Sequence, residues 1–95
     1  MPTILDERID ERGLSKLRWR CRRGLLENDL FIERFFKRFE ATLTRRQAQA
    51  LADLMELTDN DLLDLHLGRQ ALPQVSAELD RGDIHEVLTM LRKNP

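Results

Sequence analysis

Residues Leu26–Ala41, LENDLFIERFFKRFEA, decide the fold of this chain. Their apolar side chains recur at the spacing of one helical face: counted from Ile32, offsets of three, four, seven and eleven residues fall on Phe35, Phe36, Phe39 and Leu43. This spacing predicts an amphipathic α-helix whose aromatic side faces the core. Fully burying a phenylalanine is worth roughly 1.5–3 kcal/mol, so we expect the four phenylalanines of this helix to dominate stability.

The residues before this helix predict a shorter helix that ends at a glycine. Leu14, Leu17 and Cys21 fall at helical spacing between residues 14 and 23. Gly24 follows, and glycine enters at little cost the left-handed conformation that ends many helices. We therefore expect a tight turn at Gly24 before the aromatic helix begins at Leu26.

Three further helices are predicted downstream. Thr44–Gln47, TRRQ, has the form of a capping box and precedes an apolar helical face. Thr58–Asp61, TDND, predicts a turn and a fresh N-cap for a helix that continues to Gly68. Asp83–Glu86, DIHE, repeats the capping pattern before the last helix. Residues 69–82 contain a proline and end in a glycine, so we expect a loop there with at most one short helical turn.

These patterns predict an all-α fold, a small compact bundle of four to five helices. No stretch alternates with a period of two residues over enough length to indicate a strand. A chain of 95 residues can fill one hydrophobic core but not two. We assign residues 13–95 to a single helical domain. Residues 1–12 show no repeating apolar face, so we expect a flexible N-terminal tail.

Composition and charge narrow the classes of function. Sixteen Lys and Arg side chains stand against seventeen Asp and Glu side chains, which gives a net charge of -1, whereas a general polyanion binder carries a clear cationic excess. The single cysteine cannot form an internal disulfide, and no apolar run approaches the roughly 20 residues that cross a bilayer. The charged residues of 1–12 match neither a signal peptide nor a transit peptide. We expect a bacterial cytoplasmic protein that binds no nucleic acid and does not insert into a membrane.

Charge is most concentrated in Arg22–Asp29, RRGLLEND, hereafter the signature segment, which Trp19–Cys21 precedes. The signature segment places two guanidinium groups, a glycine and two carboxylates within about two helical turns. A tight turn at Gly24 would make an exposed corner, where the missing side chain lets a partner's backbone approach closely. Trp19 lies roughly opposite Leu17 on a helical wheel, and an exposed tryptophan beside arginines is typical of an interface hot spot.

Simpler explanations exist for several of these residues. Glu27 and Asp29 fall in the first turn of a helix, where the macrodipole favours negative charge by roughly 0.3–1 kcal/mol. The arginines within Arg18–Arg23 fit a solvated helix face or, together with Trp19, a small site for single-stranded RNA. Cys21 lies on the buried stripe with no histidine nearby in sequence, so we expect a core residue rather than a nucleophile.

No pattern in the chain predicts a catalytic, metal or cofactor site. His66 and His85 have no Cys or His at ligand spacing, and His66 is expected to be a partly exposed polar residue at a helix end. The G-x-G-x-x-G fingerprint of dinucleotide binding is absent from the sequence. We therefore predict a protein without a catalytic site of its own, without a metal and without a tightly bound cofactor.

The run Arg-Gly-x-x-Glu-x-Asp at residues 23–29 resembles the signature of the SdhE family, small bacterial FAD assembly factors related to mitochondrial succinate dehydrogenase assembly factor 2. The resemblance extends from about Leu17 to Arg92 and includes Phe35–Phe36 and Asp59–Leu62. It implies a small five-helix protein that binds the flavoprotein subunit of succinate dehydrogenase and promotes the covalent attachment of FAD there. Fumarate reductase is a possible second client.

The resemblance also implies which residues bind the partner. Arg23, Gly24 and Glu27 match the family's motif, and Asp29 is a weaker candidate because the helix macrodipole explains it equally well. The position of Trp19 and Arg22 beside this motif adds them to the predicted partner-binding set.

The chain departs from the family at two places, and a second class of function stays open. Leu65 stands where many relatives have a tryptophan, and Arg69–Gly82 is longer than the usual link to the last helix. The alternative function is a regulatory protein-interaction module, antitoxin-like, that acts on a membrane or cytoskeletal protein. Both functions could use the same surface of a monomer, so the residues alone do not separate them.

Overall fold

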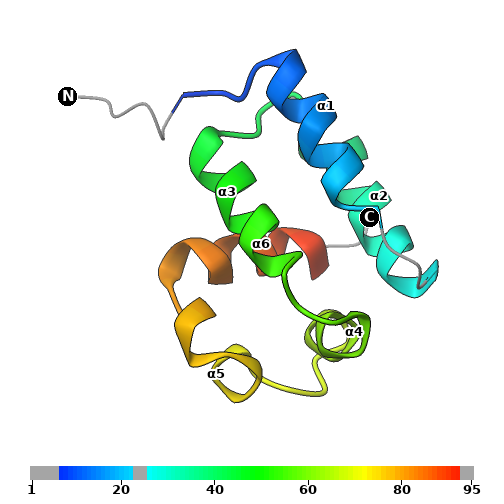
Figure 1. Cartoon of the computed structure of the whole chain (residues 1–95), viewed down its shortest axis with the longest axis vertical. Helices are drawn as coiled ribbons and strands as arrows, with labels where there is room; N and C mark the ends of the chain where they lie inside the picture. The colour runs from blue at the N-terminus through cyan, green and yellow to red at the C-terminus, as the bar shows by residue number, and fades with distance from the viewer. Residues whose placement is uncertain (1–6, 23–25, 93–95) are drawn as a thin grey trace.

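The structure, a computed structural model, describes residues 7–22 and 26–92, which fold into six α-helices and one 3-10 turn without a strand (Figure 1). In chain order these are α1 (Glu11–Arg20), α2 (Leu26–Phe39), α3 (Arg45–Leu54), α4 (Asp59–His66), α5 (Leu72–Val75), η2 (Ala77–Leu79) and α6 (Gly82–Arg92). The predicted all-α fold is confirmed. The count reaches six because α5, four residues long, is the short helical turn expected within residues 69–82 and is counted with the five longer helices.

Local side-chain caps set where α3 and α4 begin. Thr44 Oγ1 accepts a hydrogen bond from the Gln47 amide at 3.2 Å, while Gln47 Oε1 accepts one from the Thr44 amide at 3.0 Å. The predicted capping box is therefore present. Thr58 Oγ1 accepts from the Asp61 amide at 3.2 Å and starts α4. After the end of α4, Gly68 takes a φ of +73°, a conformation that a side chain would strain.

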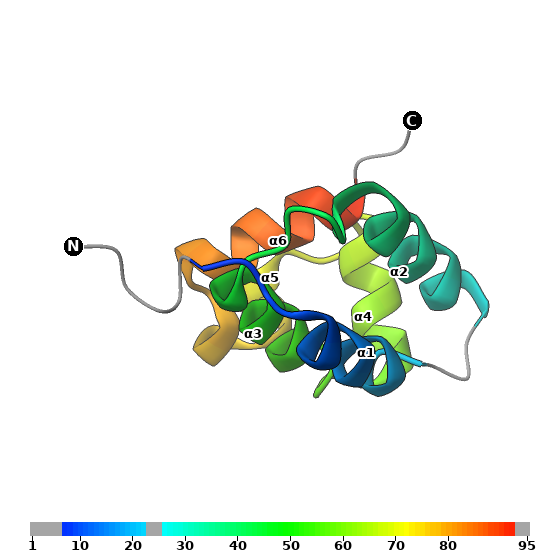
Figure 2. The ribbon, with the colours of Figure 1, turned by 90° about the horizontal axis from the view of Figure 1, so that it is seen from above.

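The core lies among α2, α3, α4 and α6, and α3 makes its main contact with α6 (Figure 2). The Phe35 ring is 1% exposed, and its centroid lies 5.5 Å from those of Phe36 and Phe39. Aromatic rings at this separation attract one another beyond what their buried area provides. The other large side chains that are fully buried are Leu43, Leu51, Leu54, Leu62, Leu65, Ile84, Val87 and Leu91. The aromatic face of α2 thus lies in the core, as its spacing predicts.

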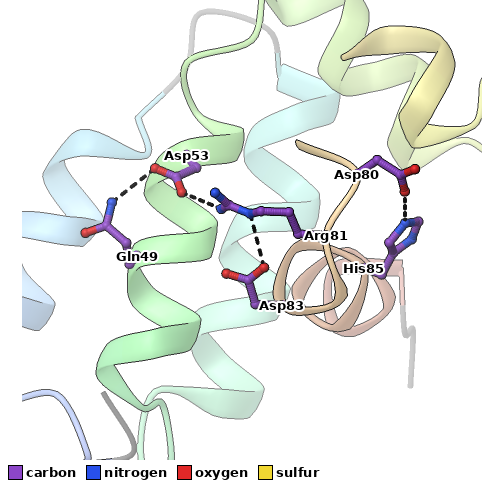
Figure 3. A network of polar contacts seen from close by, with 6 residues as sticks. All are labelled: Gln49, Asp53, Asp80, Arg81, Asp83 and His85. Carbon is purple, nitrogen blue, oxygen red and sulfur yellow. Dashed lines mark hydrogen bonds and ion pairs between the residues drawn. The ribbon is translucent and has the colours of Figure 1, made fainter. Parts of the chain in front are cut away.

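A polar network fastens the start of α6 to α3 on the outside of this core (Figure 3). Asp53 of α3 accepts hydrogen bonds from Gln49 at 3.0 Å and from the Arg81 guanidinium at 2.8 Å. The hydrogen bond that Arg81 donates to Asp53 is the main cause that raises the pKa of Arg81. Arg81 also pairs with Asp83 at 3.3 Å. Asp83 was expected to be the N-cap of the last helix. It lies instead in the first turn of α6, which begins one residue earlier at Gly82.

Residues 7–12, which we expected to belong to a flexible tail, are built into the fold. The Ile9 amide donates to the Leu43 carbonyl at 2.9 Å, and the Arg45 amide donates to the Glu7 carbonyl at 2.8 Å. Asp10 then caps α1, because its carboxylate accepts from the Gly13 amide at 2.7 Å. The helix therefore begins at Glu11 rather than near Leu14. The part of the tail before residue 7 lies outside the described residues.

Candidate docking surface

The described part of the signature segment is Arg22, just after α1, and residues 26–29 in the first turn of α2. Arg22 follows α1, and Glu27 and Asp29 lie in the first turn of α2. Glu27 is exposed and forms no ion pair within residues 7–22 and 26–92, whereas Asp29 is half-buried. Glu27 is thus placed where another molecule could reach it. Arg23 and Gly24, the two other predicted docking residues, lie outside the described residues.

Large apolar side chains are exposed next to these charges. Trp19 on α1 is 73% exposed, and Leu26 and Leu30 on α2 are 68% and 42% exposed. Trp19 and Leu26 line a shallow groove of about 590 Å³ between the two helices, with Ile32 and Phe36 also among its lining residues. We call this the α1–α2 groove. Trp19 therefore lies off the core, as its position on the helical wheel predicts, and an aromatic ring beside a groove is well suited to bury area against a partner.

Two of the arginines on α1 are already paired within the chain. Arg18 lies 2.7 Å from Glu40 and stacks over the Phe36 ring at 5.1 Å. Arg20 lies 3.2 Å from Glu56, two residues after the end of α3. The guanidinium of Arg22, which follows α1, lies 5.6 Å from the centre of the exposed Trp19 ring. Two of the four cationic side chains of α1 are thus offset by carboxylates, whereas Arg12 and Lys16 are exposed, so the ion pairs count only in part against the RNA-binding interpretation.

Asn28, in the middle of the signature segment, points into the protein and was missed by the sequence analysis. Its side chain is 0% exposed. Its amide nitrogen donates to the Asp59 carbonyl at 2.9 Å, and its amide oxygen lies 3.1 Å from His66 Nδ1. Because the Asn28 oxygen is an acceptor, His66 Nδ1 carries the proton of the neutral ring. The spacing of Asn28 from Ile32 and Phe35, four and seven residues, is the signal that could have placed it on the buried stripe.

His66 is buried, contrary to the prediction of a partly exposed residue at a helix end. It is 4% exposed, and the Phe31 ring lies against it with a centroid distance of 4.5 Å. Its Nε2 atom has no hydrogen-bond partner in the part of the chain that the structure describes. Burial and the nearby Arg92 lower the pKa of His66 from 6.5 to about 4, so the ring is neutral at pH 7. No local pattern around His66 indicates this burial, because it depends on contacts with α2 and α6.

The remaining candidate groups offer little chemistry. Cys21 is 1% exposed, which confirms the expected core position. Among residues 7–22 and 26–92, no three or more His, Cys, Asp or Glu side chains lie close enough together to hold a metal ion. Within those same residues, no helix has the length and apolar character that crossing a membrane requires.

Known sequences place the chain in a family. A sequence model described as "flavinator of succinate dehydrogenase" matches residues 15–94. The chain belongs to this family. The match to the flavinator family covers Trp19, the whole signature segment and every helix after α1. The resemblance to the SdhE family drawn from the Arg-Gly-x-x-Glu-x-Asp run is thereby confirmed.

Relatives in this flavinator family carry one recurring name. An FAD assembly factor SdhE of Ralstonia nicotianae is 47% identical over 83 residues, which are 87% of this chain and 84% of the relative. The FAD assembly factor SdhE of Coxiella burnetii is 40% identical over 54 residues, 57% of this chain and 66% of the relative. That of Legionella pneumophila is 36% identical over 62 residues, 65% of this chain and 78% of the relative. No solved structure matches the chain significantly.

Proposed function

We propose that this chain binds the flavoprotein subunit of succinate dehydrogenase and promotes the covalent attachment of FAD to that subunit. One observation carries the proposal. In a member of the flavinator family, Trp19, Leu26 and Glu27 are all exposed around the signature segment, on neighbouring ends of α1 and α2. An exposed tryptophan and leucine beside a carboxylate form the usual composition of an interface centre with a polar rim.

The energy available from this surface is sufficient for a transient complex. Burying each large apolar side chain fully is worth roughly 1.5–3 kcal/mol, and Trp19, Leu26 and Leu30 are at present mostly or partly in water. Association and side-chain ordering take back several kcal/mol of this gain. These three side chains alone therefore support an affinity for the client no tighter than micromolar, which suits a factor that must leave once the flavin is attached.

The mechanism we propose is conformational. The client and FAD supply the reacting groups, and this chain has no catalytic site, metal or tightly bound FAD of its own. By binding one conformation of the client better than the others, the protein raises the population in which FAD and the accepting side chain meet at reactive distance. Fumarate reductase is a possible second client. We further propose a monomer in the bacterial cytoplasm, where the lone thiol of Cys21 would stay reduced.

Client flavinylation in cells tests the proposal. The flavoprotein subunit is expressed with the wild-type chain or with Trp19→Ala, Leu26→Ala or Glu27→Gln, and covalent flavin fluorescence is read on a denaturing gel. Matched controls are Leu67→Ala, an exposed leucine at the end of α4, and Glu78→Gln, an exposed carboxylate on η2. We expect the first three variants to lower flavinylation and the two controls to leave it unchanged.

The outcome that would contradict the proposal is equally specific. Equal flavin fluorescence with the wild type, all five variants and no added chain would remove the function. Co-purification would then identify the partner, and recovery of a membrane or cytoskeletal protein in place of a flavoprotein would support the regulatory alternative.

A further inference from the structure

Asn28 differs from its neighbours in the first turn of α2. Leu26, Glu27 and Leu30 are exposed and Asp29 is half-buried, so Asn28 is the one fully buried side chain among residues 26–30. The next buried side chain is Ile32, a full helical turn further on. The attachment of this turn to the rest of the protein therefore depends on Asn28.

The attachment is made through directional hydrogen bonds. The Asn28 amide donates to the backbone carbonyl of Asp59, in the first turn of α4, and accepts from His66 in the last turn of α4. The two bonds reach both ends of the same helix. An apolar side chain at this place could pack with α2 rotated about its axis in several ways. An amide whose nitrogen and oxygen are both hydrogen-bonded is compatible with only one rotation of α2.

The rotation of α2 decides where the docking groups point. Successive residues of an α-helix are about 100° apart, so Glu27 and Asp29 lie on either side of the direction that Asn28 takes inward. Leu26 and Leu30, two residues before and after Asn28, are exposed on the outer side, and Leu26 lines the α1–α2 groove. Fixing Asn28 against α4 thus fixes the outward direction of the charged and apolar groups together.

We propose that Asn28 is a positioning residue for client docking. By holding the first turn of α2 against α4 in one rotation, it presents Glu27 and Leu26 in the orientation that the client recognises. This inference rests on the proposed function, because it assumes that the client binds this surface. Asn28 does not touch the client itself.

The test is a double-mutant cycle on client binding. The dissociation constant for the purified flavoprotein subunit is measured at pH 7.5 with the wild type, Asn28→Ala, Glu27→Gln and the double variant. Asn60→Ala is the matched control, because Asn60 is an exposed asparagine in the first turn of α4. Far-ultraviolet circular dichroism reports the folded fraction, and hydrogen exchange reports the protection of the α2 amides.

We expect Asn28→Ala to be fully folded and to raise the dissociation constant for the client about tenfold. Asn60→Ala should leave the dissociation constant unchanged within about twofold. The dissociation constant of the double variant should rise by less than the product of the two single fold-changes, because Asn28 acts through Glu27 and its neighbours. Exchange should quicken in the first turn of α2 and stay slow around Phe35. A merely structural role would change the folded fraction without such coupling.

Each other outcome overturns a defined statement. The inference would be overturned if Asn28→Ala bound the client as tightly as the wild type. It would also be overturned if the fold-change in the dissociation constant of the double variant equalled the product of the two single fold-changes. Either result would leave the proposed function standing. If the wild type does not bind the flavoprotein subunit, both fall. If Asn28→Ala is less than nine-tenths folded, the series is repeated in trimethylamine N-oxide, which favours the compact state, and the same criteria apply.

Discussion

Acidification should destabilise this protein through one buried histidine. His66 is neutral in the fold, and its pKa is lowered from 6.5 to about 4 because the ring is buried and lies near Arg92. Between these two pH values the unfolded chain binds a proton at His66 that the folded protein does not. Stability from the neutral ring is therefore fully present above pH 6.5, and it falls as the pH drops toward 4.

The expected loss follows from the distance between the two pKa values. They differ by about 2.5 pH units, and each unit corresponds to about 1.4 kcal/mol. The free energy of unfolding should therefore fall by about 3 kcal/mol between pH 7.5 and pH 4 on account of His66 alone, slightly less than the full product because half of the folded rings are already protonated at pH 4. That loss is a large part of the 5–15 kcal/mol by which domains are usually stable.

Urea unfolding at a series of pH values measures this loss. Wild type, His66→Leu and His85→Leu are compared between pH 7.5 and pH 4, since His85 is an exposed histidine in the same chain. The decrease in the free energy of unfolding between pH 7.5 and pH 4 should be smaller in His66→Leu by the part due to His66. In His85→Leu that part of the decrease should remain. A wild-type curve parallel to that of His66→Leu would refute the reasoning. So would a nuclear magnetic resonance titration that gives the His66 ring a pKa near 6.5.

Two further substitutions test the fold. Phe35→Ala should cost about 3–5 kcal/mol in urea unfolding because the ring is 1% exposed and contacts two other phenylalanines, whereas a cost below 1 kcal/mol would contradict its central place in the core. Thr44→Ala should lower the free energy of unfolding by about 1 kcal/mol because it removes the cap of α3. The control Thr42→Ala changes an exposed threonine two residues earlier and should lower it less. Equal losses in the two variants would argue against the capping box.

The parts of the fold that depend on neighbouring residues could be predicted from the sequence. The capping box at Thr44 involves residues three apart, and the aromatic stripe on α2 is a spacing within one helix. The cap of α1 at Asp10 and the proline in the first turn of α5 are also local signals; the cap was not recognised, and the proline was interpreted as a loop signal. These errors came from short elements whose apolar pattern has too few repeats to detect.

The parts that depend on distant residues could not be predicted. The contact of His66 with Asn28 joins residues 38 apart in sequence, so a histidine near the end of a helix was taken for a surface residue. The same separation concealed the inward direction of Asn28, although Leu26 and Glu27 beside it are exposed. Exposure of Trp19 could be predicted because the helical wheel of α1 is enough to decide it.

The way α1 is attached has a consequence for the order in which the molecule opens. Leu17 is the one fully buried side chain within α1, with Cys21 at its end, and the ion pairs from Arg18 and Arg20 lie in water, where each contributes little. Amide protons of α1 should therefore exchange with solvent sooner than those of α2 or α6. Local opening of the molecule should thus begin at the helix that carries Trp19, ahead of the helices that hold the phenylalanines.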